Sequence, residues 1–375
     1  MISLYIHIPY CVKKCLYCGF YSTPYLSKDA DDFVTALCGE ILLRRQQLAK
    51  KSIESIYLGG GTPTVLAPSQ LERMFSVLPS WIKDAELEFT SEANPSTMAA
   101  DVLSLLLHHG VNRLSIGIQS FSNRLLQVLE RRHTALEGLD AFARARTAGF
   151  KNINIDLICG IPGQNRDEWD DTLQTTLDLR PEHISLYCLS LEENTPLMHM
   201  VSSGSIRMLE DDIIADFYRY GVKKLFSAGY ARYEVSNFSL PGFECRHNLH
   251  YWKRKEYLGL GPSAGSFLSG KRYENVPDMH AYIQRIKNGK LPFRTEEEIQ
   301  TSAAAREAIL LGLRTASGIN MDHFKKEFGD VLFDRILYHA EKLQSAGLLV
   351  CSGNSIRLTD RGFMLIDEAL ARLGI

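Results

Sequence analysis

Three closely spaced cysteines, Cys11, Cys15 and Cys18, follow an apolar segment at the N-terminus in the pattern CxxxCxxC. Thiolates at this spacing can converge on one inorganic cluster, and a cubane [4Fe–4S] cluster usually takes a cysteine on each of its irons. Three local cysteines leave one iron free to bind a small molecule. The pattern therefore predicts a [4Fe–4S] cluster that can act as a reaction centre.

Two other uses of these cysteines are less well supported. A structural zinc site takes four ligands, usually as two separated pairs, and the sequence has no second CxxC pair. His7 is the nearest candidate for a fourth zinc ligand, but it falls within the expected first strand. A disulfide framework is also disfavoured, because the remaining cysteines are scattered singly. These are Cys38, Cys159, Cys188, Cys245 and Cys351.

Length and composition indicate a soluble globular protein. The 375 residues are 45% hydrophobic and 23% charged, which allows a large core and more than one domain. A net charge of −2 does not favour a surface for polyanions. The N-terminus lacks the pattern of a secretory signal, and no apolar stretch approaches the ~20 residues that a membrane span requires. Reduced thiols and a reactive cluster favour the cytoplasm.

From residue 3 to about residue 190, short strand-like segments alternate with longer amphipathic segments. Alternation at this spacing implies right-handed crossovers and a parallel sheet. Six units in one run favour an α/β fold of the partial parallel (β/α)6 barrel type over an open doubly wound sheet. The expected strands are Ser3–Ile8, Ser55–Leu58, Leu87–Thr90, Arg113–Ile118, Asn152–Ile158 and His183–Leu189. The expected helices are Ala30–Leu48, Ser69–Leu78, Ala99–His109, Asn123–Leu129, Ala135–Ala148 and Arg166–Asp178.

Polar and glycine-rich motifs follow these strands at their C-terminal ends. In a parallel β/α barrel this rim is where active sites form. We therefore expect the motifs to build one site together with the cysteines. They are Gly59–Pro63 after the second strand, Ser91–Pro95 after the third, Gln119–Phe121 after the fourth, and Asp156 with Gly160–Gly163 at the fifth.

The pattern changes after a helix expected over Arg207–Ala228. Residues 229–295 are expected to form an irregular connecting region, with Ala231–Ser239 extended and Pro241–Ser269 rich in loops. Residues 296–375 are expected to form a small winged-helix-like α+β domain that ends the chain. Its mixed charges favour a structural or protein-contact role, so no nucleic-acid partner is expected. Its predicted elements are helices over Ala303–Leu313, Asp322–Phe328 and Leu332–Ala346, a wing over Gly347–Val350 and Ser355–Leu358, and a helix from Asp360.

The motifs together resemble those of radical S-adenosylmethionine (SAM) enzymes. CxxxCxxC behind a first strand, GGGTP, the ExNP run and NxDLxxGxP are similar to the branch that contains oxygen-independent coproporphyrinogen III oxidases and HemW-type haem chaperones. The resemblance covers nearly the whole chain, with residues 1–228 as the radical-SAM barrel. It implies that the three cysteines bind the cluster and that the open iron binds SAM.

The resemblance also assigns residues to SAM. Gly60 and Gly61 would let the backbone approach SAM where a Cβ atom would clash, and a guanidinium such as that of Arg131 suits a carboxylate. Each of these assignments has a structural alternative. The glycines could form an ordinary turn at the end of a strand, Arg131 could lie at a solvated helix end, and Tyr5 could be a core residue. The residues expected to bind SAM are Tyr5, Tyr17, Gly60, Gly61, Thr62, Glu92, Gln119, Arg131, Asp156 and Ser190.

Two features favour the haem-chaperone branch over the oxidases. The oxidases carry a further cysteine two residues after the third, where this chain has Phe20. The run from Cys245 to Trp252 contains HNxxYW, which resembles the haem motif of HemW-type proteins. Imidazole is a common ligand of haem iron, and aromatic rings offer flat apolar faces to a porphyrin. The residues that the resemblance assigns to haem are His247, Asn248, Tyr251 and Trp252.

Other interpretations of this run stay open. His250 and Cys245 are alternative axial ligands, and a loop that packs on the barrel without any ligand is the structural alternative. For the whole chain we expect a haem chaperone that binds a [4Fe–4S] cluster, SAM and haem. An oxygen-independent coproporphyrinogen III oxidase is the second interpretation. A DNA-binding regulator with a cluster as sensor is the third, and it would leave GGGTP, Glu92 and Asp156 unexplained.

The resemblance further implies partners and a location. It suggests delivery of haem to haemoproteins, among them respiratory proteins of the membrane, and a homodimer that depends on cofactors. A cytoplasmic protein with peripheral contact to the inner membrane would fit these partners. Cleavage of SAM is compatible with the motifs, whereas coproporphyrinogen oxidase activity is not expected.

Overall fold

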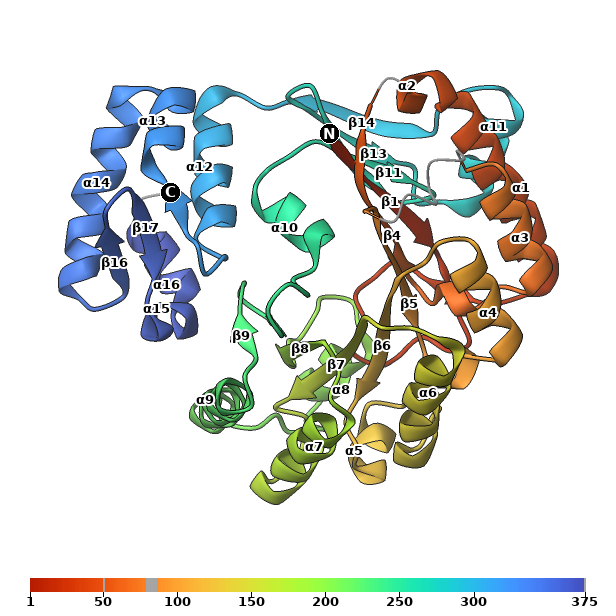
Figure 1. The fold of residues 1–375 in the computed structure, drawn as a ribbon, viewed down its shortest axis with the longest axis horizontal. Coiled ribbons are helices and arrows are strands. Elements are labelled where there is room, and N and C mark those ends of the chain that lie inside the picture. The colour runs from red at the N-terminus through yellow and green to blue at the C-terminus, as the bar shows by residue number, and fades with distance from the viewer. Residues whose placement is uncertain (50, 79–85, 374–375) are drawn as a thin grey trace.

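The computed structural model describes residues 1–49, 51–78 and 86–373. Its centre is a sheet in which six parallel strands neighbour one another in chain order (Figure 1). This arrangement confirms the predicted partial (β/α)6 barrel. The six strands are β1 (Ile2–Ile8), β4 (Ile53–Gly60), β5 (Glu88–Ala93), β6 (Arg113–Gln119), β7 (Ile153–Cys159) and β8 (His183–Cys188).

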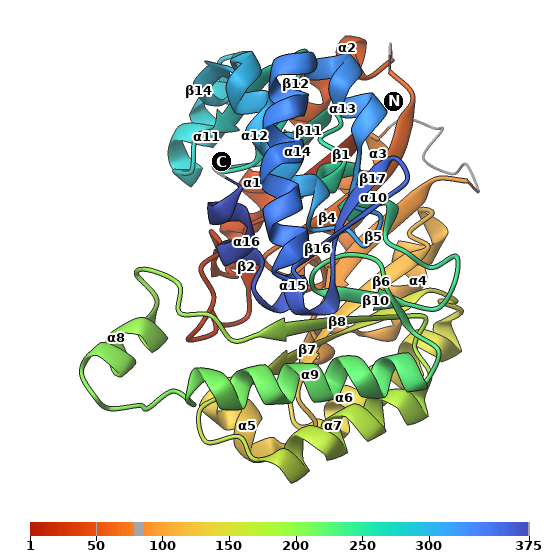
Figure 2. The same ribbon diagram turned by 90° about the vertical axis from the view of Figure 1, so that its left-hand side faces the viewer.

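Helices cover the outer face of these strands (Figure 1), and α9 packs on β7 and β8 (Figure 2). The apolar sides of most of these helices share one buried core with the outward-facing residues of the sheet. The helices on this face are α1 (Ser27–Leu43), α2 (Arg45–Ala49), α3 (Pro68–Ser76), α4 (Ala100–His108), α5 (Asn123–Val128), α6 (Ala135–Ala148), α7 (Arg166–Leu179) and α9 (Asp211–Ser227). The short helix α8 (Pro196–Ser202) projects beside the sheet (Figure 2). Short 3-10 turns lie at Pro63–Val65 and Pro95–Thr97.

The inner face of the barrel is polar because successive residues of a strand point to opposite faces. On β6, Leu114, Ile116 and Ile118 are fully buried in the outer core. Arg113 and Ser115, which alternate with them, line the interior. The neighbouring strands β5 and β7 follow the same alternation. The barrel therefore encloses polar groups that can hold a polar ligand.

Residues 229–295 are more regular than the sequence indicated. They contain two helices and most of the strands that extend the sheet at both edges, with β11 parallel to β1 and the outer strands antiparallel. The expectation of an irregular region was wrong, since backbone pairing with distant strands orders these short segments. The division at residues 228 and 295 stays a prediction. The elements are β9 (Ala231–Arg232), β10 (Asn237–Ser239), α10 (Arg246–Trp252), β11 (Tyr257–Leu260), β12 (Gly265–Leu268), β13 (Lys271–Asn275), α11 (Met279–Lys287) and β14 (Phe293–Glu298).

The C-terminal part has its own hydrophobic core and the predicted winged-helix-like order of helices followed by a hairpin. It contacts the rest of the chain through α10, which lies between β4 and α12 (Figure 1), and through an ion pair of Arg254 Nε with Glu307 Oε2 at 3.1 Å. Residues 374–375 of the predicted domain lie outside the described residues. The elements are α12 (Thr301–Gly312), β15 (Ile319–Asn320), α13 (Met321–Phe328), α14 (Asp330–Ser345), β16 (Leu349–Ser352), β17 (Ser355–Leu358), α15 (Asp360–Met364) and α16 (Ile366–Arg372). No described helix combines the length and apolar character needed to cross a membrane.

Candidate functional site

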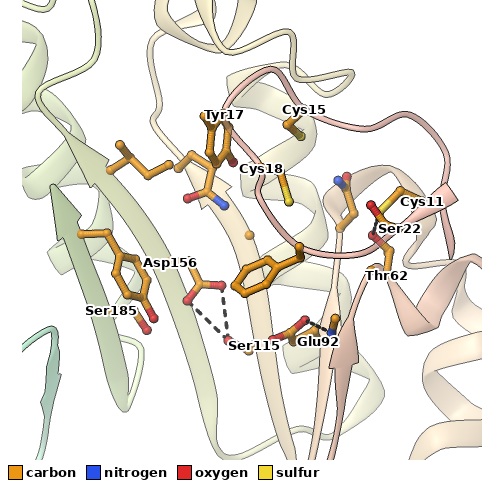
Figure 3. Close-up of a pocket in the computed structure, with 18 of the residues that line it drawn as sticks. Cys11, Cys15, Tyr17, Cys18, Ser22, Thr62, Glu92, Ser115, Asp156 and Ser185 are labelled. Atoms are coloured by element: carbon orange, nitrogen blue, oxygen red, sulfur yellow. Dashed lines mark hydrogen bonds between the residues drawn. The ribbon is translucent and has the colours of Figure 1, made fainter. Parts of the chain in front are cut away.

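The three predicted cluster cysteines line one cavity of about 560 Å³ at the C-terminal rim of the barrel (Figure 3). Their loop is closed by the short pair of strands β2 (Tyr10–Cys11) and β3 (Thr23–Pro24). Inside the loop, the backbone N–H of Cys18 donates to the carbonyl of Cys15 at 3.2 Å. The short loop that β2 and β3 close therefore brings the three cysteines to one wall of the cavity.

His7 is not free to join this loop as a fourth ligand. Its Nε2 lies 2.9 Å from the carbonyl oxygen of Tyr21, so that nitrogen donates. Its Nδ1 then accepts from the hydroxyl of Tyr5 at 2.9 Å. Burial lowers the pKa of His7, which keeps the ring neutral in this arrangement. Both ring nitrogens are engaged, and this argues against the zinc alternative.

The GGGTP segment fastens the cysteine loop to the barrel. The N–H of Gly61 donates to the carbonyl of Ile8 at 2.8 Å, and that of Thr62 to the carbonyl of Tyr10 at 2.7 Å. Gly60 has a φ of +100°, and a Cβ atom there would lie 2.2 Å from His7 Nδ1. Contacts within the protein therefore require glycine at position 60. The alternative of an ordinary strand-end turn would not by itself require it. Both glycines also line the cavity, as expected for SAM contact.

The donors around the cysteines suit an iron–sulfur cluster. Arg131 Nη1 donates to Cys15 Sγ at 3.3 Å, and Thr62 Oγ1 lies 3.6 Å from Cys11 Sγ. Arg131 is thus directed into the site and is not a solvated helix end. Within the described ranges, no three His, Cys, Asp or Glu side chains are close enough to bind a single metal ion.

Two carboxyl groups face the cavity from neighbouring parts of the sheet (Figure 3). Glu92 accepts from the N–H of Gly60 at 3.1 Å and from the hydroxyl of Tyr57 at 2.9 Å. Burial raises the pKa of Glu92 to about 7. Asp156 accepts from Asn154 Nδ2 at 2.7 Å and from Ser115 Oγ at 3.3 Å. Burial also raises the pKa of Asp156. Both carboxyls are held in place by donors and would be stabilised as anions by a cationic ligand.

Of the other residues predicted to bind SAM, three line the first cavity and one lies outside it. Tyr17, Gln119 and Ser190 line the same cavity as the cysteines. Gln119 has a φ of +70° beside an irregularity in the pairing of β6 with β7, and such backbone strain is typical of functional sites. Tyr5 does not line this cavity and instead borders a second one.

Several further residues line the first cavity and were not predicted. Arg113 is buried at the base of β6, and Asn154 donates to Ser115 Oγ at 2.7 Å and to Ser185 Oγ at 2.9 Å. The signal that could have found them is the alternation of polar residues inside the predicted strands. Among the unpredicted lining residues are Tyr57, Arg113, Ser115, Asn154, Ser185 and Cys188.

The second cavity, of about 310 Å³, lies against the HNxxYW helix α10. It is lined by a set of aromatic side chains together with Asn248 and Gly265, the aromatic residues being Tyr5, Tyr57, His247, Tyr251 and Tyr257. His247 stacks on Tyr57 with ring centroids 5.0 Å apart, and Tyr251 stands edge-on to it at 4.8 Å. Tyr57 and Asn248 line both cavities, so the two spaces share a wall.

His247 is the histidine of this run that has a free nitrogen. Its Nδ1 lies 2.8 Å from Ser55 Oγ, which in turn lies 2.7 Å from Ser3 Oγ. Its Nε2 is buried and has no hydrogen-bond partner in the part of the chain that the structure describes. Burial lowers the pKa of His247 to about 3. A neutral ring that donates from Nδ1 to Ser55 would leave the Nε2 lone pair available to a metal.

The two alternative axial ligands are occupied by other contacts. His250 Nδ1 lies 3.0 Å from Glu54 Oε2, and its Nε2 lies 2.6 Å from the carbonyl of Glu256. The thiol of Cys245 is fully buried 3.4 Å from Glu88 Oε1, and burial raises its pKa to about 12. Trp252, at the end of α10, borders neither cavity. Of the four residues predicted for haem, the structure brings His247, Asn248 and Tyr251 together.

A buried carboxylate that the sequence analysis missed holds α10 in place. Glu88 of β5 accepts from the backbone N–H of Arg246 and from that of His247, both at 2.9 Å. These N–H groups belong to the first turn of the helix, where no carbonyl of the helix itself can reach them. Negative charge at a helix N-terminus is also favoured by the helix dipole. Glu88 therefore fixes the position of His247 relative to the barrel.

Comparison with known proteins agrees with this site. Residues 5–176 match the radical SAM superfamily, and residues 300–365 match the HemN C-terminal domain. A protein of Lactococcus lactis named "Heme chaperone HemW" is 37% identical over 367 residues, which cover 97% of this chain and 94% of that protein. The chain belongs to the HemW family of radical SAM proteins. A HemW of Bacillus subtilis is 34% identical over 373 residues, which cover 98% of each chain.

The chain also shares its fold with an oxidase of known structure. The coproporphyrinogen III oxidase HemN of Escherichia coli superposes with a TM-score of 0.85 and 23% identity, covering 99% of this chain and 89% of that one. At this identity the likeness shows the fold alone. Membership in the HemW family confirms the choice of branch made from Phe20 and the HNxxYW run. In the structure Phe20 is 69% exposed and lines the first cavity.

Proposed function

We propose that the protein is a haem chaperone that binds a [4Fe–4S] cluster and SAM in the first cavity and haem at the second. His247 carries the haem part of the proposal, since this residue lines a cavity walled by tyrosines and its Nε2 has no hydrogen-bond partner among the described residues. Flat aromatic faces and one free imidazole nitrogen are the groups that a haem requires. Delivery of haem to haemoproteins, some of them at the membrane, and a cofactor-dependent dimer in the cytoplasm complete the hypothesis.

In the first cavity, Cys11, Cys15 and Cys18 would hold the cluster while the other residues position SAM. The cluster, when bound, supplies an electron that can cleave the sulfonium bond of SAM. The Arg131 guanidinium stabilises thiolate charge at Cys15, with which it is in contact. Glu92 would accept a hydrogen bond from the ammonium or ribose of SAM, and Asp156 would accept from the ribose hydroxyls. Burial raises the pKa of both carboxyls, so a cationic ligand would favour their ionised forms.

In the second cavity, the residues of α10 and β4 orient the imidazole. In the tautomer protonated on Nδ1, Ser55 Oγ accepts a hydrogen bond from His247 and fixes the ring, as outer partners of metal-bound histidines do. Tyr57 covers one face of the ring and Tyr251 its edge. The haem iron would meet a neutral nitrogen, because burial keeps the pKa of His247 near 3.

A haem titration of the reconstituted protein tests this assignment. We expect His247→Ala to weaken haem binding more than about tenfold, because loss of a ligand should cost at least as much as loss of its outer partner. The cluster content should be unchanged. His280→Ala, which changes an exposed histidine on α11, is the matched control and should leave haem affinity as it is. Unchanged affinity in His247→Ala would remove this residue from the haem site.

The oxidase alternative is tested by an assay of its own. Anaerobic incubation of the holoprotein with coproporphyrinogen III, SAM and a reductant should give no protoporphyrinogen. Clear turnover would favour the oxidase, and haem binding would then be explained as occupation of the porphyrinogen site by a related macrocycle.

A further inference from the structure

Two cysteines outside the cluster loop meet on the wall of the first cavity. Cys159 ends β7 and Cys188 ends β8, and the two residues are paired in register on neighbouring parallel strands. Their Sγ atoms are 3.5 Å apart. No other two thiols are in such contact within the residues that the structure describes. Cys159 is buried, whereas Cys188 is exposed and lines the same cavity as the cluster cysteines.

The geometry of the sheet allows a bond between these sulfurs. Neighbouring strands lie about 4.7–4.9 Å apart, and disulfides span Cα–Cα distances of about 4.4–6.8 Å. Side-chain rotation could therefore bring the two Sγ atoms to the bonded distance of about 2.05 Å with little movement of the strands. The contact is thus compatible with both a dithiol and a disulfide.

The surroundings give the two thiols different roles. The hydrogen bond from Cys159 lowers the pKa of Cys188, while that bond and burial raise the pKa of Cys159. Thiolate character and access determine which cysteine attacks a disulfide first. Cys188 has both, so it is suited to attack, and the buried Cys159 is placed to resolve the product.

We propose that Cys159 and Cys188 form a reversible dithiol–disulfide site at the mouth of the first cavity, with a low-molecular-weight disulfide as the oxidant. The Cys188 thiolate attacks one sulfur of the oxidant, forming a mixed disulfide and releasing one thiol. Cys159 then displaces the second thiol as the protein disulfide forms. Two electrons pass from the cysteine pair to the oxidant, and the two protons leave with the released thiols.

Peptide mapping of the anaerobic holoprotein tests the site. The protein is treated with oxidised glutathione, alkylated at low pH and digested with trypsin. Wild type should yield a linked pair of peptides, residues 152–166 with residues 167–207, and a thiol reductant should separate them. Cys188→Ser should lose the linkage, and Cys159→Ser should retain glutathione on Cys188. Unlinked peptides in wild type with its cluster intact would overturn the proposal.

A control and a second measurement separate this inference from the proposed function. Cys351→Ser, which changes a cysteine in the hairpin of the C-terminal domain, should link like wild type, and loss of the linkage there would contradict the assignment. An excess of SAM should slow the linkage several-fold, because Cys188 lies on the cavity wall. This measurement rests on the proposed SAM site. If the disulfide between Cys159 and Cys188 forms at the same rate with SAM present, the dithiol site is supported and the placement of SAM in the first cavity is contradicted.

Discussion

The carboxyl of Glu92 leads to a quantitative prediction about stability. Burial raises its pKa from 4.5 to about 7 in the folded protein. A carboxyl with a raised folded pKa contributes stability below its unfolded pKa, and that contribution is lost as the pH rises through the folded value. A shift of this size therefore costs the folded state roughly 3 kcal/mol at pH 8 and about 2 kcal/mol at pH 6.

Glu92→Gln should remove this cost. The neutral amide resembles the protonated carboxyl: its oxygen can accept from the Gly60 N–H, and its NH₂ group can donate to the Tyr57 oxygen. We expect the variant to be more stable than wild type by roughly 3 kcal/mol at pH 8 and by about 2 kcal/mol at pH 6. It should also lose SAM binding, because an amide cannot neutralise the ammonium group.

Urea unfolding at the two pH values, followed by circular dichroism on cluster-loaded protein without SAM, measures the first effect. Equilibrium dialysis with labelled SAM measures the second. Glu297→Gln, at an exposed position on β14, is the matched control and should change neither quantity. A Glu92→Gln protein that is no more stable than wild type at pH 8, or whose advantage does not fall at pH 6, would refute the reasoning.

Two further substitutions test the cluster and the helix α10. Wild type should hold about four irons per chain after anaerobic reconstitution, and Cys15→Ala should abolish the cluster by iron analysis and absorbance; an intact cluster would refute the ligand assignment. Glu88→Gln should weaken the hold on the first turn of α10 by about 1–3 kcal/mol, since an amide is a poorer acceptor for two buried N–H groups. Titrations should then show weaker haem binding with SAM affinity unchanged, and an equal loss of both would mean that the barrel itself is disturbed.

The sequence predicted the parallel half of the fold because each unit there is local. Every strand is followed by its own helix, so alternation along the chain is enough to place β1 and β4–β8 side by side. The strands β11–β14 were missed for the opposite reason. Each has only four to six residues. β12, β13 and β14 pair with their neighbours in sequence, but β11, which joins them to the barrel, pairs with β1 at the far end of the chain. Nothing in the local pattern specifies such a partner.

In the candidate site, the residues that belong to short sequence motifs could be predicted. The residues that position those motifs through hydrogen bonds could not. The cysteines and GGGTP stand in short runs whose spacing limits the geometry. Glu88 and Ser55 stand alone in ordinary strand sequences, and only the fold shows that they meet α10. Tyr5 was placed with SAM by resemblance, yet its side chain turns to His7 and the second cavity. A strand position fixes which face a side chain takes, but not which of two adjacent cavities it borders.

The shared wall between the cavities connects the two parts of the proposed function. Tyr57 donates to Glu92 through its hydroxyl and stacks on His247 through its ring. One side chain thus touches both the proposed acceptor for SAM and the proposed ligand for haem. The cysteine motif specifies that a radical-SAM cluster can form at the rim. The position of the proposed haem residues beside it depends instead on β4, β5 and α10, through the contacts of Ser55, Tyr57 and Glu88 with this helix.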